Sequence, residues 1–151
     1  MSIRPNIKIS PYISKQIKNE KTIFGIKFVN HTKVPITDVK IELRMLHSRN
    51  HDHGIVYEAK YLSLKKESFF EISEYNSDET NAFFATRVGI IDNLEIIWNE
   101  PQYQHLQLVI RATHSKSGFH NTVKMIYRSK NQDIVSGEHL TGTNLNISPD
   151  N

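Results

Sequence analysis

Two alternating runs lie in residues 22–46, which read TIFGIKFVNHTKVPITDVKIELRML. The run 22–29 places apolar residues at every second position, and the run 36–46 repeats this spacing. Successive side chains of a β-strand point to opposite faces, so the spacing predicts two half-buried strands. A polar connection at 30–35 separates them, and the pattern favours antiparallel neighbours with one wet face.

The rest of the chain continues this pattern, with one exception. Residues 92–98 are compatible with a single helical turn that Pro101 ends. Further strand-like runs lie at 7–13, 55–64, 68–75, 82–91, 106–113, 119–127 and 133–140. About eight or nine short strands predict an all-β fold, an antiparallel immunoglobulin-like β-sandwich. We expect a single domain over 1–140 and a polar, disordered tail over 141–151.

Composition excludes several classes of protein. The 151 residues can bury the core of one domain. The chain has no cysteine, which excludes a disulfide scaffold, a zinc–thiolate site, an iron–sulfur cluster and a thiol nucleophile. No apolar run approaches the roughly 20 residues of a membrane-spanning helix, and no signal-peptide pattern opens the chain. We therefore expect this chain itself to be soluble.

The charge is unevenly distributed. Residues 1–66 carry 13 Lys and Arg against 5 Asp and Glu, whereas residues 67–100 carry one Arg against 8 acids. A basic first third suits an anionic partner such as a phosphate, a lipid headgroup or a nucleic acid. The alternative is that these basic residues pair with the acidic residues of the middle third, within the fold or across a subunit contact. Both interpretations remain open from the sequence.

A histidine-rich segment lies at 46–54 and reads LHSRNHDHG. The pattern predicts a polar loop. His51 and His53 would share one face of a strand, as in some metal sites, but a metal site needs three or four ligands. We predict no metal here and favour a solvated loop. An anion-binding loop is the next interpretation, because Arg49 offers a bidentate fork for phosphate.

The sequence HSKSG at 114–118 predicts a hairpin turn with the composition of a small anion nest. It lacks the spacing of a P-loop, and we favour a surface turn because such turn residues are common. The chain contains no G-x-S-x-G, H-E-x-x-H or dinucleotide-binding glycine motif. We therefore predict that the protein is not an enzyme and uses no cofactor.

Adjacent aromatic residues give a further signal. Phe69-Phe70 and Phe83-Phe84 place neighbouring rings on opposite faces of a regular strand. One ring of each pair is then expected to leave the core, which indicates an oligomer interface or a ligand pocket.

The order of these pieces resembles the cytosolic domain of inward-rectifier potassium channels. The similar segments are Arg4-Pro5, Ile9-Ser10, Lys21-Thr22 with FGIKFVN after it, 38–43, Leu62-Ser63-Leu64 and Phe69-Phe70. In the terminal hairpin they are Thr113, Phe119, Thr122-Val123, Asp133-Ile134 and Gly137. The chain departs from the family at Ser136, where tryptophan is usual, and near Lys130, where a tyrosine is expected.

The resemblance implies a cytosolic sandwich whose membrane half is not in this chain. There is no selectivity filter here, so the chain by itself does not conduct ions. Bacterial effectors of cyclic-nucleotide antiphage systems have a similar layout, with two membrane helices and a β-rich cytosolic domain. The implied function is a non-catalytic sensor of a cyclic nucleotide second messenger, or of another anionic ligand. The implied context is a homo-oligomeric domain at the inner membrane, with no nucleic acid polymer as partner.

Residue type and position suggest the binding residues. The candidates for phosphate contact are Arg49, His51, His53, Lys116 and Arg128. The candidates for base stacking are Tyr57 and Tyr61. The alternative function is the gating domain of an inward-rectifier-like channel, in which Arg4, Lys8 and Lys15 would face anionic lipid. A structural or oligomerisation sandwich without a small ligand is a further alternative.

Overall fold

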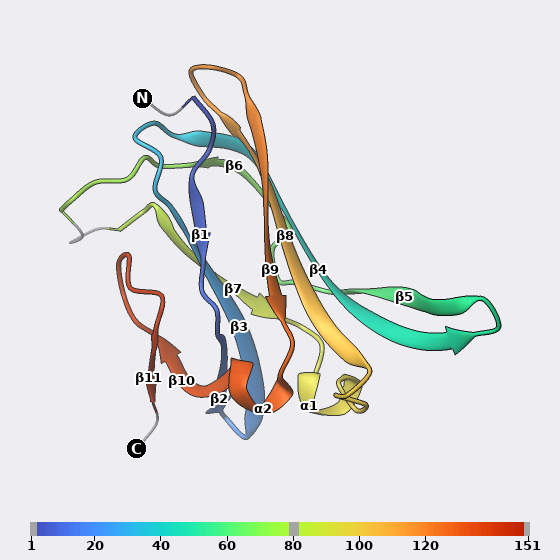
Figure 1. The fold of residues 1–151 in the computed structure, drawn as a ribbon. Helices are drawn as coiled ribbons and strands as arrows, with labels where there is room; N and C mark the ends of the chain where they lie inside the picture. Colours follow the sequence, from blue (N-terminus) through green and yellow to red (C-terminus); the bar gives the residue numbers. More distant parts are fainter. Residues whose placement is uncertain (1–2, 79–81, 150–151) are drawn as a thin grey trace.

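The computed structural model describes residues 3–78 and 82–149, and strands dominate these ranges (Figure 1). The strands are β1 (Ile7–Ile9), β2 (Ile13–Lys18), β3 (Lys21–Asn30), β4 (Ile36–His51), β5 (Gly54–Leu62), β6 (Ser68–Ile72), β7 (Ala85–Ile90), β8 (Gln104–His114), β9 (His120–Tyr127), β10 (Ile134–His139) and β11 (Ile147–Pro149). The helices are α1 (Leu94–Ile97) and α2 (Lys130–Asp133), each a single short turn. The expected helical turn near residues 92–98 is confirmed as α1.

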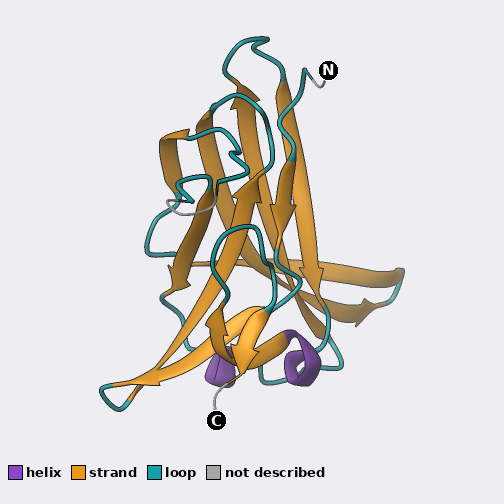
Figure 2. Cartoon of the chain, turned by 90° about the vertical axis from the view of Figure 1, so that its left-hand side faces the viewer, coloured by secondary structure: helices purple, strands orange, loops and turns teal. Residues whose placement is uncertain are grey.

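The strands form two sheets. The first has the order β1-β3-β2-β10-β11, with β7 also paired to β3. The second has the order β5-β4-β8-β9, with β6 also paired to β4. All pairs are antiparallel except β2 and β10. Figure 2 shows the strands as the main framework, with the short helices near one end. The predicted all-β sandwich is confirmed.

The core lies between the sheets and follows the alternation in the sequence. Phe24, Ile26 and Phe28 of β3 are buried, and the odd-numbered residues 39–45 of β4 are buried opposite them. Each fully buried side chain of this size contributes about 1.5–3 kcal/mol relative to leaving it exposed. Trp98 and Tyr127 close the core, and the Tyr127 hydroxyl donates to the Ser10 carbonyl at 2.8 Å.

Both phenylalanine pairs divide between core and surface, the first by alternation along β6 and the second in the turn that precedes β7. Phe84 is 2% exposed and Phe69 packs against the core. Phe70 and Phe83, in contrast, are 87% and 74% exposed.

The predicted loop at 46–54 is wrong. β4 continues to His51, and β5 returns from Gly54 after a turn at Asp52 and His53. This hairpin, the arm, projects from the body (Figure 1). The predicted strand over 55–64 is confirmed as β5, but the extension of β4 through residues 46–51 is not visible in the sequence, because those residues are mostly polar and at most partly buried.

The predicted disordered tail over 141–151 also differs from the structure. Residues 147–149 form β11, which pairs with β10. The segment before β11 is held by buried Lys27, whose Nζ donates to the carbonyls of Leu140 and Asn144 at 2.5 and 2.7 Å. Tertiary contacts therefore order a polar segment that has no local signal. Residues 150 and 151 lie outside the described residues.

Candidate anion-binding cleft

A cleft of about 660 Å³ opens at one end of the sandwich. It lies where the segment before β1, the β3–β4 connection and the β8–β9 turn meet. Its lining residues are Ile3, Asn6, His31, Thr32, Lys33, Val34, His114, Lys116 and Ser117. This volume is within the roughly 300–1,000 Å³ of typical small-molecule sites.

Hydrogen bonds hold the first segment against the β8–β9 hairpin. Ser117 Oγ donates to the Ile3 carbonyl at 2.5 Å. Asn121 Nδ2 donates to the Pro5 carbonyl at 2.8 Å. The segment is therefore fixed on this side of the cleft by side chains of the hairpin.

The same segment is tied to the β3–β4 connection on the other side. The Asn6 N–H donates to Thr32 Oγ1 and the His31 N–H donates to the Asn6 carbonyl, both at 2.8 Å. The His31 ring stacks on Tyr75, with centroids 5.3 Å apart and planes at 14°. These contacts set both the backbone and the ring of His31 at the cleft.

His114 organises the hairpin turn. Its ring is buried, and its Nδ1 accepts the N–H groups of Ser117 at 3.0 Å and Lys116 at 3.3 Å. An Nδ1 that accepts hydrogen bonds carries no proton, which leaves Nε2 as the donor atom of the ring. The Ser115 N–H also donates to the Pro35 carbonyl at 3.2 Å, which joins the turn to the β3–β4 connection. The position of Lys116 thus depends on His114.

The cleft is electropositive in composition. Lys33 and Lys116 are exposed at its border, and His31 and His114 lie in its wall. Among the described residues that line it there is no Asp or Glu. Lysine ammonium groups act as point charges for phosphate and other anions. Hydroxyl and amide groups of Asn6, Thr32 and Ser117 add polar contacts nearby.

The structure separates the binding residues that the sequence suggests. Lys116 lies at the cleft, but Arg49, His51, His53, Tyr57 and Tyr61 lie on the arm. His114, beside the cleft, pairs with Ile36 at the start of β4. The turn at the tip of the arm follows His51, at the other end of the same strand. At ~3.3 Å per residue, the β4 positions from Arg44, opposite Tyr61, to His51 lie about 26–50 Å along the strand from Ile36. They do not form one site.

Two of these side chains already contact neighbouring residues, one on the arm and one on β8. Arg49 Nε contacts Glu58 Oε2 at 2.8 Å, in a pair that is exposed at both ends. The Tyr57 ring meets His105 edge-on, with centroids 5.9 Å apart. Within the described residues no group of three or more His, Cys, Asp or Glu side chains is placed to hold a metal.

The remaining predicted residues are scattered. Arg128 follows β9, and its N–H donates to Asp133 Oδ2 at 2.8 Å. Lys15 contacts Glu95 Oε1 at 2.5 Å, whereas Lys8 is exposed on β1. Arg4 alone lies near the cleft, with its guanidinium 5.9 Å from the centroid of the Phe119 ring. The three residues proposed for lipid contact are therefore distributed over different elements.

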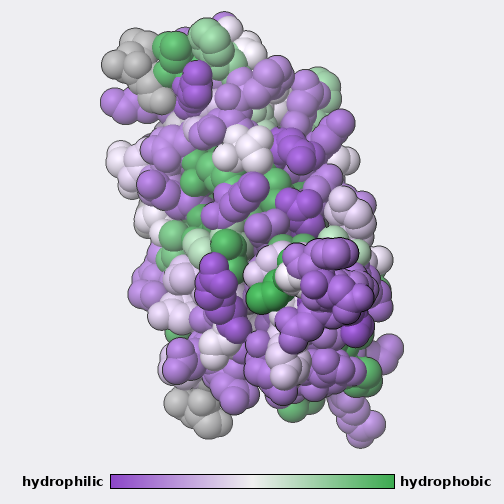
Figure 3. Space-filling view, turned by 45° about the vertical axis from the view of Figure 1, so that its right-hand side comes forward, coloured by the Kyte–Doolittle hydropathy of each residue, from purple (hydrophilic) through white to green (hydrophobic). Residues whose placement is uncertain are grey.

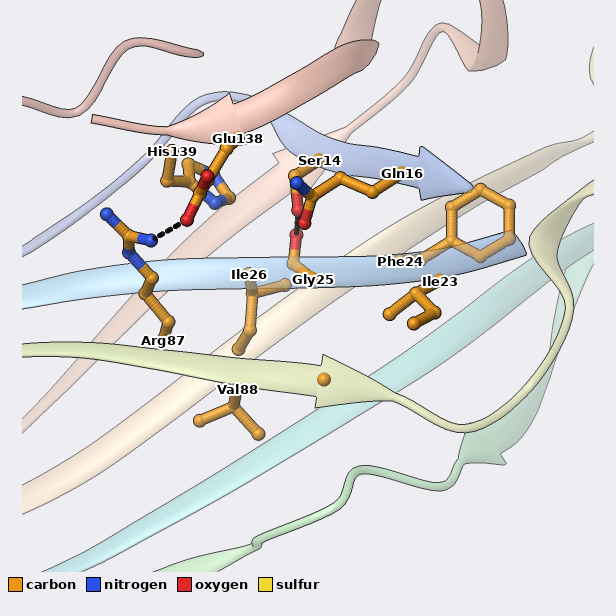
Figure 4. A pocket seen from close by; sticks show the side chains of 11 residues that line it. Ser14, Gln16, Ile23, Phe24, Gly25, Ile26, Arg87, Val88, Glu138 and His139 are labelled. Atoms are coloured by element: carbon orange, nitrogen blue, oxygen red, sulfur yellow. Dashed lines mark hydrogen bonds and ion pairs between the residues drawn. The ribbon is translucent and has the colours of Figure 1, made fainter. Parts of the chain in front are cut away.

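A second cavity, of about 150 Å³, lies over the paired glycines Gly25 and Gly89 (Figure 4). Arg87 Nη1 and Glu138 Oε1, 2.8 Å apart, border it, and Ser14 Oγ donates to the Gly25 carbonyl at 3.4 Å. This space holds only a few water molecules. It is too small for a nucleotide.

Sequence reasoning missed His31 and Lys33. Both lie in the short connection before Pro35, which the sequence marks only as polar. The pairing of Ile36 with His114 is what brings that connection beside the β8–β9 turn.

The chain matches no known protein family and no curated protein. No helix among the described residues is long and apolar enough to cross a membrane.

Proposed function

We propose that this protein is a non-catalytic sensor domain that binds a phosphate-bearing ligand, a cyclic nucleotide, in the anion-binding cleft. The observation that carries this proposal is a cleft of about 660 Å³ with two lysines and two histidines and no carboxylate among its described lining residues. Placing an anion between Lys33 and Lys116 relieves the repulsion between their charges. The cleft volume leaves room for a nucleobase beside the phosphate.

Binding rather than catalysis is supported by how His114 is used. Its Nδ1 accepts the N–H groups of Lys116 and Ser117 in its own turn. A general base needs a free nitrogen within hydrogen-bond reach of the proton that it takes. The cleft thus offers positioned donors and charge for an anion.

The location of the cleft supports a signalling function. Three segments distant in sequence border it, so a bound ligand would link the β3–β4 connection, the β8–β9 turn and residue 3. A ligand shifts a conformational equilibrium only through its different affinities for the two states. We propose that such a shift is passed to a membrane part, as in the antiphage effectors that the sequence resembles. The domain would then act at the cytosolic face of the inner membrane.

The position of Arg4 favours a second candidate function. Arg4 adjoins the cleft through Ile3 and the hairpin residue Phe119. A phosphoinositide headgroup presents the same phosphate chemistry as a nucleotide. The domain would then be the gating domain of an inward-rectifier-like channel that responds to anionic lipid.

Binding assays with site variants test the proposal. We expect one cyclic nucleotide among mono-, di- and trinucleotides to raise the melting temperature, by a few degrees at about 100 times its Kd. Lys33→Gln and Lys116→Gln should each weaken that ligand about tenfold or more. Arg49→Gln, on the arm, is the matched control and should bind like the parent.

The outcomes separate the candidates. A shift with soluble phosphoinositide headgroups but no nucleotide, lost in the two lysine variants, favours the lipid-gated function. A nucleotide whose binding is lost in Arg49→Gln but kept in Lys116→Gln would move the site to the arm. Absence of binding to every nucleotide, headgroup and inorganic phosphate at millimolar concentration contradicts a ligand-binding function and leaves a structural sandwich.

A further inference from the structure

β5 is an edge strand with an unpaired side. Among the described residues it pairs only with β4, along residues 43–51. Its exposed apolar side chains include Ile55 at 67%, Tyr57 at 59% and Tyr61 at 65%. An exposed, regular edge offers a row of free N–H and C=O groups to another strand. Figure 3 shows the side of the molecule that carries the arm, where hydrophobic patches are small and surrounded by hydrophilic residues.

The turn fixes which backbone groups of β5 face outward. A two-residue turn joins His51 to Gly54, and the register continues without a shift to Leu62. The residues that flank such a turn form a hydrogen-bonded pair, and such pairs recur at every second position. The even-numbered residues of β5 therefore bond β4. The N–H and C=O groups of Tyr57, Ala59 and Tyr61 point to the free edge.

The charges of β5 are placed so that two copies of the strand, running antiparallel, complement each other. Residues 56–62 read VYEAKYL, with Ala59 at the centre. Glu58 and Lys60 are placed symmetrically about this centre, and so are Tyr57 and Tyr61. A strand of this kind matches a second copy of itself in the antiparallel direction, because each charge then lies opposite its counterion.

We propose that two copies of this chain associate through antiparallel pairing of their β5 strands, with Ala59 opposite the partner's Ala59. In this register Glu58 lies opposite the partner's Lys60, and Tyr57 lies opposite the partner's Tyr61. Odd-numbered residues meet odd-numbered residues, so the backbone groups that face the free edge are the ones that pair. The symmetry is two-fold, and the interface uses the same strand of each copy.

The geometry of the register strengthens the charge pairing. Positions 58 and 60 would form non-hydrogen-bonded pairs across the interface, in which the Cα atoms are about 4.5 Å apart and side chains are closest. Glu58 already contacts Arg49 on its own arm, so it would lie between two cations. Pairing ends before residue 63, because the Ser63 N–H donates to Asp92 Oδ2 at 2.6 Å. The second sheet would then continue across both copies.

Charge-reversal variants test the register. Glu58→Lys places Lys opposite Lys, and Lys60→Glu places Glu opposite Glu, at both symmetric pairs. We expect each variant alone to weaken dimerisation at least about tenfold in sedimentation equilibrium, since like charges directly opposite are unfavourable. An equimolar mixture of the two should form a heterodimer, and the double variant should dimerise like the parent. Both substituted positions, 58 and 60, are exposed, so circular dichroism should show the same fold.

Hydrogen exchange supplies the second measurement. Amides of Tyr57, Ala59 and Tyr61 should become protected as protein concentration rises, while those of Glu58 and Lys60 stay protected at every concentration. A parent protein that is monomeric up to about millimolar concentration overturns the proposal. So does a dimer that both single reversals leave unchanged. The proposal is independent of the ligand of the cleft, because Ala59 lies opposite Leu46, roughly 33 Å along β4 from Ile36.

Discussion

The two halves of β4 belong to one strand and have opposite surroundings. Residues 36–45 lie in the body, where β8 pairs on one side and the core covers one face. Residues 46–51 lie in the arm, where β5 is exposed throughout residues 54–61. The body half is specified by burial, which the sequence shows as alternation. The arm half is specified by backbone pairing and by its turn, and the mostly polar sequence of residues 46–51 shows no such alternation.

The largest expected effect comes from deleting core volume in the body half. Leu108 lies opposite Leu43, and both are almost fully buried. Leu108→Ala should lower the free energy of unfolding by about 2–5 kcal/mol, because it loses burial and leaves a cavity. Val56→Ala on the arm is the control, with an expected change within about 0.5 kcal/mol. Urea denaturation measures both, and similar losses for the two would contradict the comparison.

The second effect contrasts a buried charge with an exposed one. Lys27 is 1% exposed and donates to two carbonyls of the segment before β11. Lys27→Met should cost about 1.5–3 kcal/mol, since it removes charge-assisted hydrogen bonds. Arg49→Gln removes an exposed ion pair and should cost less than about 1 kcal/mol. Exchange of the amides in β11 should rise only in the Lys27 variant. Unchanged protection there would show that Lys27 does not hold the segment.

The arm should be sensitive at its turn. Gly54 has φ +125°, a conformation that side chains other than glycine rarely adopt, although nothing lies within 4 Å of an added Cβ. Gly54→Ala should therefore cost about 1 kcal/mol, through backbone strain alone. We expect faster amide exchange at Val56 and Glu58 and unchanged exchange in β8. Loss of protection in β8 as well would mean that arm and body unfold together.

The smallest effect is on the pH dependence of stability in the body. Burial lowers the pKa of His139; its bond to the Tyr12 carbonyl opposes this, and nearby Lys27 and Arg87 lower the pKa further. The folded state therefore binds a proton less readily than the unfolded state, whose histidine pKa is about 6.5. The stability that neutral His139 contributes is therefore fully present above that pH and is lost as the pH drops below it.

His139→Gln tests this dependence. A glutamine can still donate to the Tyr12 carbonyl, but it does not titrate. The variant should lose less stability than the parent between pH 7 and pH 5, measured by urea denaturation at each pH. An identical loss in both proteins would show that His139 does not contribute.

Much of the fold could be predicted from the sequence, and the reason is burial. Residues 22–46 show the alternation of two half-buried strands, and the HSKSG segment shows its turn. Both are local patterns produced by a face that must avoid water. The split of Phe69-Phe70 between core and surface follows from the same period of two, whereas Phe83-Phe84 divide within a turn. The class of fold required no tertiary information.

The arrangement of the candidate site was decided by tertiary structure alone. Arg49 and Lys116 have similar chemistry and both lie near turns, yet the pairing of β4 with β8 sends them to opposite ends of a strand. His31 becomes a neighbour of Lys116 only because Ile36 pairs with His114. Such contacts join residues that are far apart in sequence. No local period encodes them, so the sequence names candidate side chains, and strand register determines which of them meet.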